Sequence, residues 1–518
     1  MRSLFRNAGK VSGLTMISRV FGLIRDQMFA AMIGAGFFAD CFVIAYRIPN
    51  LFRDLLAEGA LSNAFVPTLT RTIHQDSPKQ GMALVSKLMG LLIMVVGTIV
   101  VLGIYFAPEV VRFTAPGFAD IAGKAELTTL LTRIMFPFLF FVSLGAVMMG
   151  IHHAHQSFTY PSIAPILFNF LSIAGGVFIY FGDYKNETAV IIWAVGTLLG
   201  GLAQWWVQVP PLVRSGRVPL PSFKKVFANK RVREMLFLMG PAVIALSGAQ
   251  INILVNTILA SLLEEGAPSW LSYAFRLMQL PIGIFGVAIG VVALAQASKD
   301  VSQNNTQAFH QNINQAMKLN WLLTIPCAVG LWVMAEPIIA LLFERGAFTP
   351  FDTIMTAKAI QFFALGLPFY AGVKVKGPIF FTHKLANIPM TASLTGIAIN
   401  ILFSVLFYKT LGHWGLALGT SLGMFVNFTL LTLYFSIKFG GYENKTSIVF
   451  FAKVTLISAF MGFVVFLISH YVFTSTQPSE LYKLLHVSIT LLAAIFVYIL
   501  LVKLLGIWNL LTKVIQKP

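Results

Sequence analysis

Apolar stretches long enough to cross a lipid bilayer recur along the whole chain and are separated by short polar connections. A hydrocarbon core of about 30 Å is crossed by roughly 20 helical residues, so each stretch predicts one membrane-spanning helix. Fourteen such stretches are expected, at 11–34, 38–69, 82–107, 125–151, 158–182, 188–212, 234–263, 269–297, 314–343, 352–381, 387–410, 414–437, 447–474 and 481–506. The pattern therefore predicts an all-α polytopic membrane protein.

Composition agrees with this pattern and excludes a soluble protein. Of the 518 residues, 57% are hydrophobic and 11% are charged, against about 25% charged in an ordinary soluble domain. Lysine and arginine exceed aspartate and glutamate by 37 to 19, and the connection 213–233 carries seven bases and no acid. Such a basic connection is typical of the cytoplasmic side. With an even number of spans, both termini are then cytoplasmic, and nucleic acid is not needed to explain the charge.

The chain contains an internal repeat with an offset of about 229 residues. AYRIPNL at 45–51 aligns with AFRLMQL at 274–280. In the next span of each half, APEVV at 107–111 corresponds to the similar AEPII at 335–339. Chance similarity between two apolar sequences is one explanation. The other is two pseudo-symmetric six-helix lobes with a substrate path between them, as in many transporters.

This repeat predicts the domain organisation. We expect an N-terminal lobe at 1–212, a basic cytoplasmic loop at 213–233, a C-terminal lobe at 234–438 and two further helices at 439–518. The last two helices have no counterpart in the repeat, so they have either a purpose of their own or only a packing role.

Charged residues are concentrated in the first two predicted spans, where an ionised group costs about 2.5 to 3.5 kcal/mol near the bilayer centre. They are Arg19, Arg25, Asp26, Asp40, Arg47, Arg53, Asp54 and Glu58. At 100° per residue, Asp40, Arg47, Asp54 and Glu58 project within about 40° of one another on one helix face. Such a polar face predicts a watery cavity at these helices.

The cavity charges do not balance. Arg276, Lys374 and Lys376 of the second half bring the positive groups to seven, against four acids. An anionic ligand would neutralise the excess positive charge. The planar guanidinium group of arginine can donate two parallel hydrogen bonds to the oxygens of a phosphate or pyrophosphate. The alternative is that these charges pair among themselves and only hold helices together.

Other chemistry finds little support in the sequence. No G-x-x-x-x-G-K-[ST] phosphate loop is present, so ATP is not the expected energy source. No connection is long enough for a soluble catalytic domain, so an enzyme is not expected. Asn169 and Asn400 lie in apolar spans and either hydrogen-bond between helices or coordinate a cation. No metal site is predicted from the neighbouring histidines, which have no carboxylates nearby: His152, His153 and His155.

Several segments carry a resemblance to a known family. The most specific are SRVFGLIRD at 18–26, GAGFFAD at 34–40 and PNLFRDLLAEGALSNAFVP at 49–67, and supporting ones include RLM at 276–278 and FERGAFTPFD at 343–352. With these, the chain resembles the MurJ (MviN) family of bacterial lipid II flippases, in the multidrug/oligosaccharidyl-lipid/polysaccharide exporter superfamily. The resemblance implies two six-helix lobes around a central cavity, with the last two helices forming a groove for a polyprenyl tail. It also implies transfer of lipid II from the cytoplasmic to the periplasmic leaflet of the inner membrane for peptidoglycan synthesis, by alternating access.

The resemblance also implies which residues bind the substrate. The matching positions are Arg19, Arg25, Arg53, Arg276, Asp40, Glu58, Asp26, Ser269 and Lys374. The arginines would bind the pyrophosphate, while Asp40 and Glu58 would balance their charge. Some relatives place acids beside the RLM motif, where this chain has Phe275 and Gln279, so acids are not expected to act there.

The expected partners are lipid II, membrane lipids and proteins of cell-wall synthesis and division. No cofactor is expected, and transport would be coupled to the membrane potential or to a cation. Three alternatives stay open: a flippase for another polyprenyl-linked oligosaccharide, a membrane-embedded glycosyltransferase or polymerase, and a scaffold without transport. Export of a cationic drug fits poorly, because the cavity charges would repel it.

Overall fold

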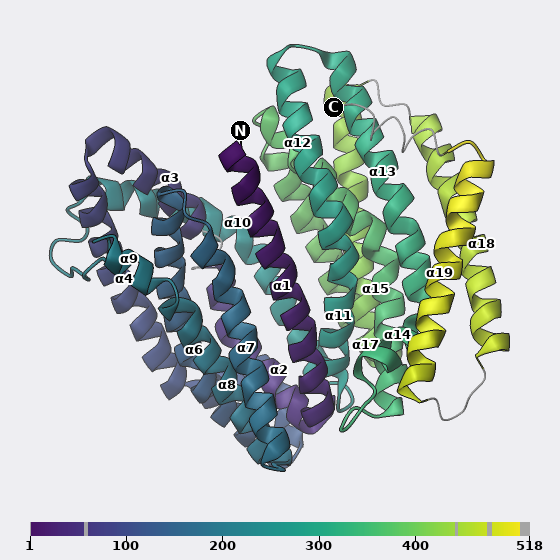
Figure 1. Cartoon of the computed structure of the whole chain (residues 1–518), viewed down its shortest axis with the longest axis horizontal. Helices are drawn as coiled ribbons and strands as arrows, with labels where there is room; N and C mark the ends of the chain where they lie inside the picture. The colour runs from purple at the N-terminus through teal and green to yellow at the C-terminus, as the bar shows by residue number, and fades with distance from the viewer. Residues whose placement is uncertain (1, 56–60, 441–443, 474–478, 508–518) are drawn as a thin grey trace. The chain divides into compact units, whose positions relative to one another are not determined.

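The computed structural model describes the chain except residues 1, 56–60, 441–443, 474–478 and 508–518 (Figure 1). The described residues are helical and contain no strand. They form two compact units, 1–268 with 345–348 and 269–344 with 349–518. The fold class predicted from the sequence, an all-α membrane protein, is confirmed.

The first unit is a bundle in which α1 packs on α7, α2 on α6, and α8 on both α6 and α7. Its largest apolar core surrounds α4 and α6, with Leu84, Phe136 and Val147 buried. The elements of this unit are α1 (Arg2–Ile33), α2 (Phe37–Phe52), α3 (Ser62–Arg71), the π-helical turn η2 (Thr72–Asp76), α4 (Pro78–Tyr105), α5 (Ala107–Thr114), the 3₁₀ turn η3 (Pro116–Asp120), α6 (Lys124–Ala154), α7 (Thr159–Phe181), α8 (Asn186–Trp206), α9 (Val209–Arg214) and α10 (Lys230–Ser261).

In the second unit α15 packs between α13 and α17, while α18 lies on α13 and α19 lies on α18 and α14. This unit begins within the first turn of α11. Its elements are α11 (Ala267–Pro281), the π-helical turn η4 (Ile282–Gly286), α12 (Val287–Ser302), α13 (Thr306–Val333), α14 (Ala335–Phe343), α15 (Pro350–Lys376), α16 (Ile379–Thr382), α17 (Asn387–Phe439), α18 (Asn444–Val472) and α19 (Glu480–Leu504).

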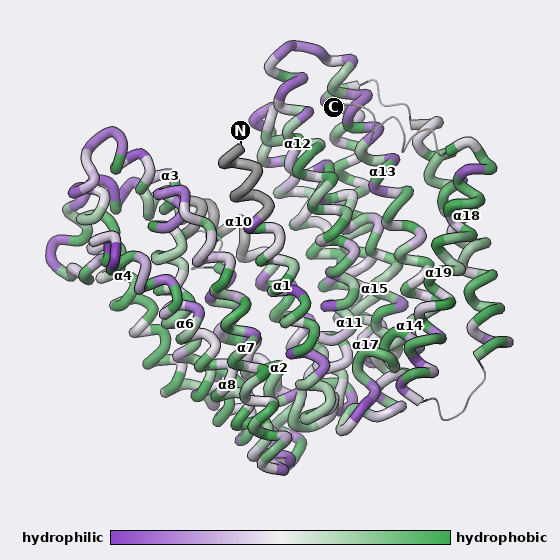
Figure 2. The backbone as a smooth tube through the Cα atoms, viewed as in Figure 1, coloured by the Kyte–Doolittle hydropathy of each residue, from purple (hydrophilic) through white to green (hydrophobic). Residues whose placement is uncertain are grey.

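Every predicted span overlaps one of these helices. Within the described residues, ten helical segments are long and apolar enough to cross a membrane. One of them, α17, covers two predicted spans. Its backbone leaves the helical conformation between these spans, at Gly412 (φ 64°). Apolar residues predominate along α18 and α19, whereas hydrophilic residues gather in connections such as that between α12 and α13 (Figure 2). The chain is thus a multi-pass membrane protein, and its helices are consistent with fourteen spans.

The six-helix repeat is visible in the helix boundaries. Corresponding helices begin 226 to 228 residues apart, in the pairs α1 and α10, α4 and α13, α5 and α14, α6 and α15, and α7 and α17. Even a local irregularity is repeated, since π-helical turns begin at residues 53 and 282, 229 residues apart. This agreement in order and irregularity is what the repeat predicted from the sequence requires. No part of the repeat corresponds to α18 and α19.

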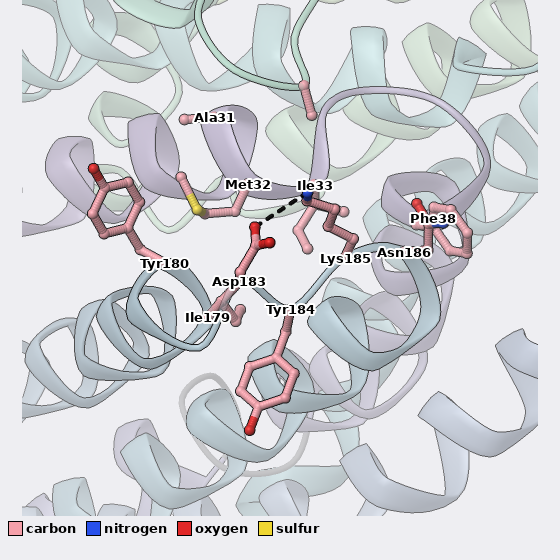
Figure 3. A pocket seen from close by; sticks show the side chains of 11 residues that line it. Ala31, Met32, Ile33, Phe38, Ile179, Tyr180, Asp183, Tyr184, Lys185 and Asn186 are labelled. Carbon is pink, nitrogen blue, oxygen red and sulfur yellow. Dashed lines mark ion pairs between the residues drawn. The ribbon is translucent and has the colours of Figure 1, made fainter.

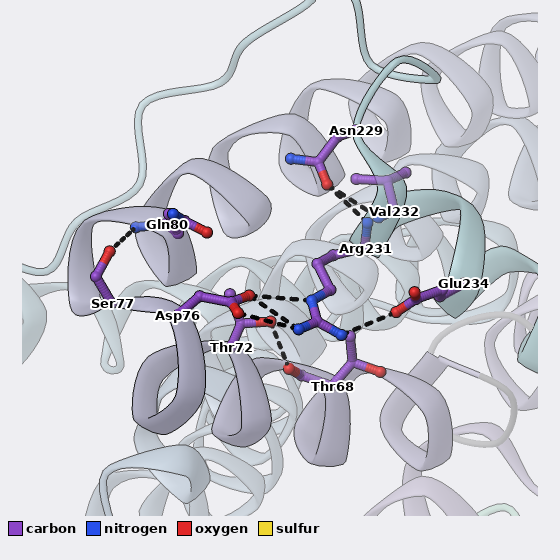
Figure 4. Close-up of polar contacts among 9 residues, drawn as sticks. All are labelled: Thr68, Thr72, Asp76, Ser77, Gln80, Asn229, Arg231, Val232 and Glu234. Atoms are coloured by element: carbon purple, nitrogen blue, oxygen red, sulfur yellow. Dashed lines mark hydrogen bonds and ion pairs between the residues drawn. The ribbon is translucent and has the colours of Figure 1, made fainter.

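The helix α10 is tied to the first unit by a cluster of polar contacts (Figure 4). Asn229 caps α10 by accepting hydrogen bonds from the backbone of Arg231 and Val232. The Arg231 guanidinium donates to both oxygens of Asp76, at 3.0 and 3.1 Å, and to Glu234 at 3.1 Å. By sequence position α10 repeats α1, which assigns it to the C-terminal lobe. The lobe boundaries drawn from the repeat stay a prediction, because packing units need not follow a repeat.

Candidate functional site

An arginine and the adjacent aspartate form a pair on α1. Arg25 donates from Nε and Nη2 to a single oxygen of Asp26, at 3.2 and 2.9 Å, and its guanidinium lies over the ring of Phe168 on α7 at 5.4 Å. The two side chains keep 18% and 15% of their surface exposed. Neighbouring residues do not face each other on a helix, so the arginine bends toward its neighbour while its guanidinium stacks on the Phe168 ring of α7.

The same arrangement follows α2. Arg53 donates from Nε and Nη2 to one oxygen of Asp54, again at 3.2 and 2.9 Å, and both side chains are half-buried. These residues lie in the π-helical turn 53–55, which holds more residues than an α-helical turn. The projection of residues 40–58 assumed an unbroken α-helix, and the backbone departs from that conformation at Arg53.

Asp40 differs from both pairs, because it is completely buried within the first unit. Its Oδ2 accepts from Lys124 Nζ at 3.0 Å and from the backbone N–H of Gly266 at 2.8 Å. The two side chains are 0% and 1% exposed, and Lys124 Nζ also lies 4.4 Å from the ring centre of Phe118. The charge count made from the sequence omitted Lys124. It stands 84 positions from Asp40 in a polar connection, and no local pattern links the two.

The other predicted residues are placed in varied surroundings. Arg19 on α1 and Lys374 on α15 are exposed, Arg276 on α11 is half-buried, and Ser269 is fully buried. Glu58 lies outside the described residues. Among the predicted residues, the structure pairs Arg25 with Asp26, while Arg53 forms an ion pair with Asp54 and Asp40 forms one with Lys124.

Two glycines of the family motifs allow a close backbone contact at the end of α1. The N–H of Ala347 donates to the carbonyl of Ala31 at 2.8 Å. Gly34 and Gly346 both have positive φ, and a Cβ on either would lie 2.6 Å or less from a backbone oxygen of the other segment. The motif FERGAFTPFD thus holds a turn against α1.

The same motif is anchored in the second unit by a tryptophan. The buried Trp270 donates from Nε1 to Asp352 Oδ1 at 2.9 Å, and Asp352 Oδ2 accepts from the backbone of Thr349 at 2.9 Å. Asp352 therefore completes the capping box of α15, whose N-cap residue is Thr349, and also accepts from the indole.

We predict that Trp270→Phe lowers the free energy of unfolding by about 1.5 to 3 kcal/mol, the usual value of a hydrogen bond to a charged group. The ring is retained, so the loss reflects the missing N–H donor. Thermal unfolding of the purified protein in detergent measures this, with the exposed Trp206→Phe as the matched control. An unchanged melting temperature in Trp270→Phe would show that the bond contributes nothing.

The second unit contains a cavity of about 1100 Å³ between α18 and the helices α13, α14 and α15. Trp332, Phe463 and Phe466 line its apolar part, and Glu336 and His470 line its polar part. Beside it, Lys483 of α19 pairs with Glu344 at 3.2 Å. The helices α18 and α19, which lie outside the repeat, thus line one side of a large groove. The family resemblance predicts a tail-binding groove at these helices.

A smaller pocket of about 400 Å³ lies in the first unit, between the end of α1 and the connection from α7 to α8 (Figure 3). Asp183 points toward Lys185 across its mouth, at 3.2 Å, and both side chains are largely exposed. None of the predicted residues that the structure describes lines this pocket. It is therefore not a candidate for the charged site.

Comparison with known families identifies the relatives of this chain. The family model described as "Lipid II flippase MurJ" matches residues 29–507. The chain belongs to the MurJ family. A lipid II flippase MurJ of Burkholderia cenocepacia is 35% identical over 433 residues, which are 83% of this chain and 83% of that protein.

Solved structures agree with this membership. A MurJ flippase in an inward closed conformation matches with a TM-score of 0.80 and 27% identity, covering 96% of this chain and 98% of that one. An inward-facing MATE-family multidrug transporter of the MOP superfamily matches with a TM-score of 0.70, covering 84% and 99%. At 16% identity, the second match shows a shared fold only. The resemblance inferred from the motifs is confirmed.

Proposed function

We propose that this MurJ family member flips lipid II from the cytoplasmic to the periplasmic leaflet of the bacterial inner membrane, to supply peptidoglycan synthesis. The observation that carries the proposal is the pair of Arg–Asp neighbours in the family motifs, Arg25 with Asp26 and Arg53 with Asp54. Each arginine donates to the aspartate next to it in the sequence, and an incoming anion would compete for these N–H groups.

The two Arg–Asp pairs are partly exposed, whereas the Asp40–Lys124 pair is buried, so the partners of the two arginines are easier to exchange. A partly exposed pair contributes about 0 to 1 kcal/mol, and each arginine here directs two N–H groups to one carboxylate oxygen. A pyrophosphate offers several oxygens in the bidentate geometry that guanidinium prefers. Exchange of the aspartate for pyrophosphate is therefore favourable at Arg25 and Arg53.

The remaining predicted residues have different parts in the proposal. Arg19, Arg276 and Lys374 would add positive charge for the pyrophosphate, and Ser269 a hydroxyl. Asp40 would hold the first unit together through Lys124 instead of touching the substrate. The groove beside α18 would take the polyprenyl tail, because apolar side chains form much of its lining.

We further propose that transport proceeds by alternating access, without catalysis or a cofactor, and with both termini in the cytoplasm. The energy would come from the membrane potential or a cation. Binding of the dianionic headgroup would favour the state in which arginines of both lobes reach it, because a ligand shifts a conformational equilibrium only through its different affinity for the two states.

Complementation tests the proposal. Cells depleted of their own lipid II flippase and supplied with this chain should resume growth, because lipid II would again reach the periplasmic leaflet. Growth is scored together with the amount of chain in the membrane fraction. Failure to grow despite normal membrane levels would overturn the function proposed here.

A further inference from the structure

The connection between α8 and α10 carries a basic and aromatic surface that includes none of the residues proposed to bind the substrate. Arg231 is neutralised by Asp76 and Glu234. The other bases between residues 213 and 233 are exposed: Arg214, Arg217, Lys224, Lys225, Lys230 and Arg233. Between them stand three large apolar side chains that are also exposed, Leu220 (78%), Phe223 (52%) and Phe227 (60%).

This connection is held in place against the first unit. Val226 is buried in the core around α4, and the N–H of Ser222 donates to the carbonyl of Ser86 at 2.9 Å. Lys87 Nζ donates to the carbonyl of Lys225 at 3.4 Å. At Gly90 a Cβ would lie 2.3 Å from the Ser222 carbonyl oxygen, so the loop backbone lies directly on α4. The exposed aromatic and basic side chains are therefore presented by a fixed backbone.

A groove of about 360 Å³ opens next to the start of this connection. Its walls are apolar, with Leu167 of α7, Ala203 of α8 and Pro211 of α9. Tyr160 and Trp206 line the groove too, and both are amphipathic rings of the kind found at headgroup level. Arg214 is its charged residue, and no carboxylate pairs with Arg214 within the described part of the chain.

We propose that this groove and the adjoining loop 213–233 form a binding site for anionic glycerophospholipids of the leaflet that the loop faces. An acyl chain would lie in the groove between Leu167 and Pro211, and the phosphate would meet Arg214. Leu220, Phe223 and Phe227 would insert among neighbouring chains, as apolar residues of interfacial segments do. Lys224 and Lys225 would contact further headgroups.

A lipid fits this surface better than an acidic protein does. The loop directly follows the candidate membrane span Asn186–Arg214, so a lipid headgroup is the anion expected beside it. Exposed phenylalanines alternating with bases match a surface that is apolar below and anionic above. A basic residue near an anionic leaflet contributes about fivefold in affinity, equivalent to about 1 kcal/mol.

The test uses the full chain in nanodiscs of phosphatidylcholine with a rising fraction of brominated phosphatidylglycerol or brominated phosphatidylcholine. Bromine quenches tryptophan fluorescence at close range. The emission of Trp206 is obtained by subtracting the fluorescence of the Trp206→Phe variant from that of the unsubstituted chain. We expect half-quenching at a fraction of the anionic lipid at least about fivefold lower than for the zwitterionic lipid. Equal quenching by the two lipids would overturn the proposal.

A variant without three of the loop's bases, and a matched control, test whether these charges cause the preference for the anionic lipid. The variant Arg214→Gln/Lys224→Gln/Lys225→Gln should lose the preference for the anionic lipid. The control removes three exposed lysines of the second unit, in the variant Lys299→Gln/Lys384→Gln/Lys409→Gln, and should keep it. A preference that persists in the first variant, or disappears in both, would contradict a site at this loop.

Discussion

Replacing Arg25 with alanine is expected to reduce lipid II transport at least about 100-fold while leaving the amount of protein in the membrane unchanged. The substitution removes two charge-assisted hydrogen bonds to the pyrophosphate, each contributing about 1.5 kcal/mol or more, and about 3 kcal/mol corresponds to that factor. The folded state loses little, since the pair with Asp26 joins adjacent residues of one helix and is partly exposed. Complementation and the rate of transport measure the first effect, and membrane levels measure the second.

A second variant separates charge from geometry at this position, and a variant of another arginine serves as the control. Arg25→Lys keeps the charge but loses the planar fork, so intermediate transport is expected. Arg112→Ala removes an exposed arginine of α5 and should leave transport intact. If Arg25→Ala supported normal growth at normal membrane levels, Arg25 would not bind the substrate.

Replacing Asp40 or Lys124 alone should destabilise the protein severely. Each substitution leaves an uncompensated charge in a site where both side chains are 1% exposed or less, and breaking a buried pair costs about 3 to 5 kcal/mol. Asp40→Asn and Lys124→Met should each lower the melting temperature of the purified protein and its yield in the membrane. The exposed pair of Asp183 and Lys185 supplies the control, and Lys185→Met should change neither quantity.

The double variant Asp40→Asn/Lys124→Met decides between a structural and a substrate-binding role. The introduced amide can still accept from the Gly266 N–H, and the introduced thioether chain fills the space beside the aromatic rings without a charge. Stability and transport should therefore both recover, because a buried ion pair can be replaced by neutral groups at little cost. Recovery of stability with transport still absent would show that Asp40 acts on the substrate itself.

The elements that the sequence predicted well are those set by local pattern. Apolar length located each membrane span, and the alignment of Arg47 with Arg276 revealed a repeat that the paired helices reproduce. Adjacency along the chain placed Arg25 beside Asp26 and Arg53 beside Asp54.

What the sequence could not predict depends on contacts between distant segments. Lys124 reaches Asp40 because α2 packs on α6, and nothing near either residue signals that pairing. The backbone of residues 53–55 is π-helical, which a projection at a constant angle per residue cannot show. The packing of α10 with the first unit likewise depends on Asp76 and Arg231, 155 positions apart.

Measuring which leaflet lipid II occupies tests most directly whether this chain carries lipid II across the membrane through the arginines of its helices. Cells depleted of their own flippase would express either the intact chain or Arg25→Ala, and a hydrolase restricted to the outer face of the inner membrane would be added. We predict cleavage of lipid II in cells with the intact chain and its protection in cells with Arg25→Ala. Protection in both, at confirmed membrane levels, would contradict lipid II transport by this chain.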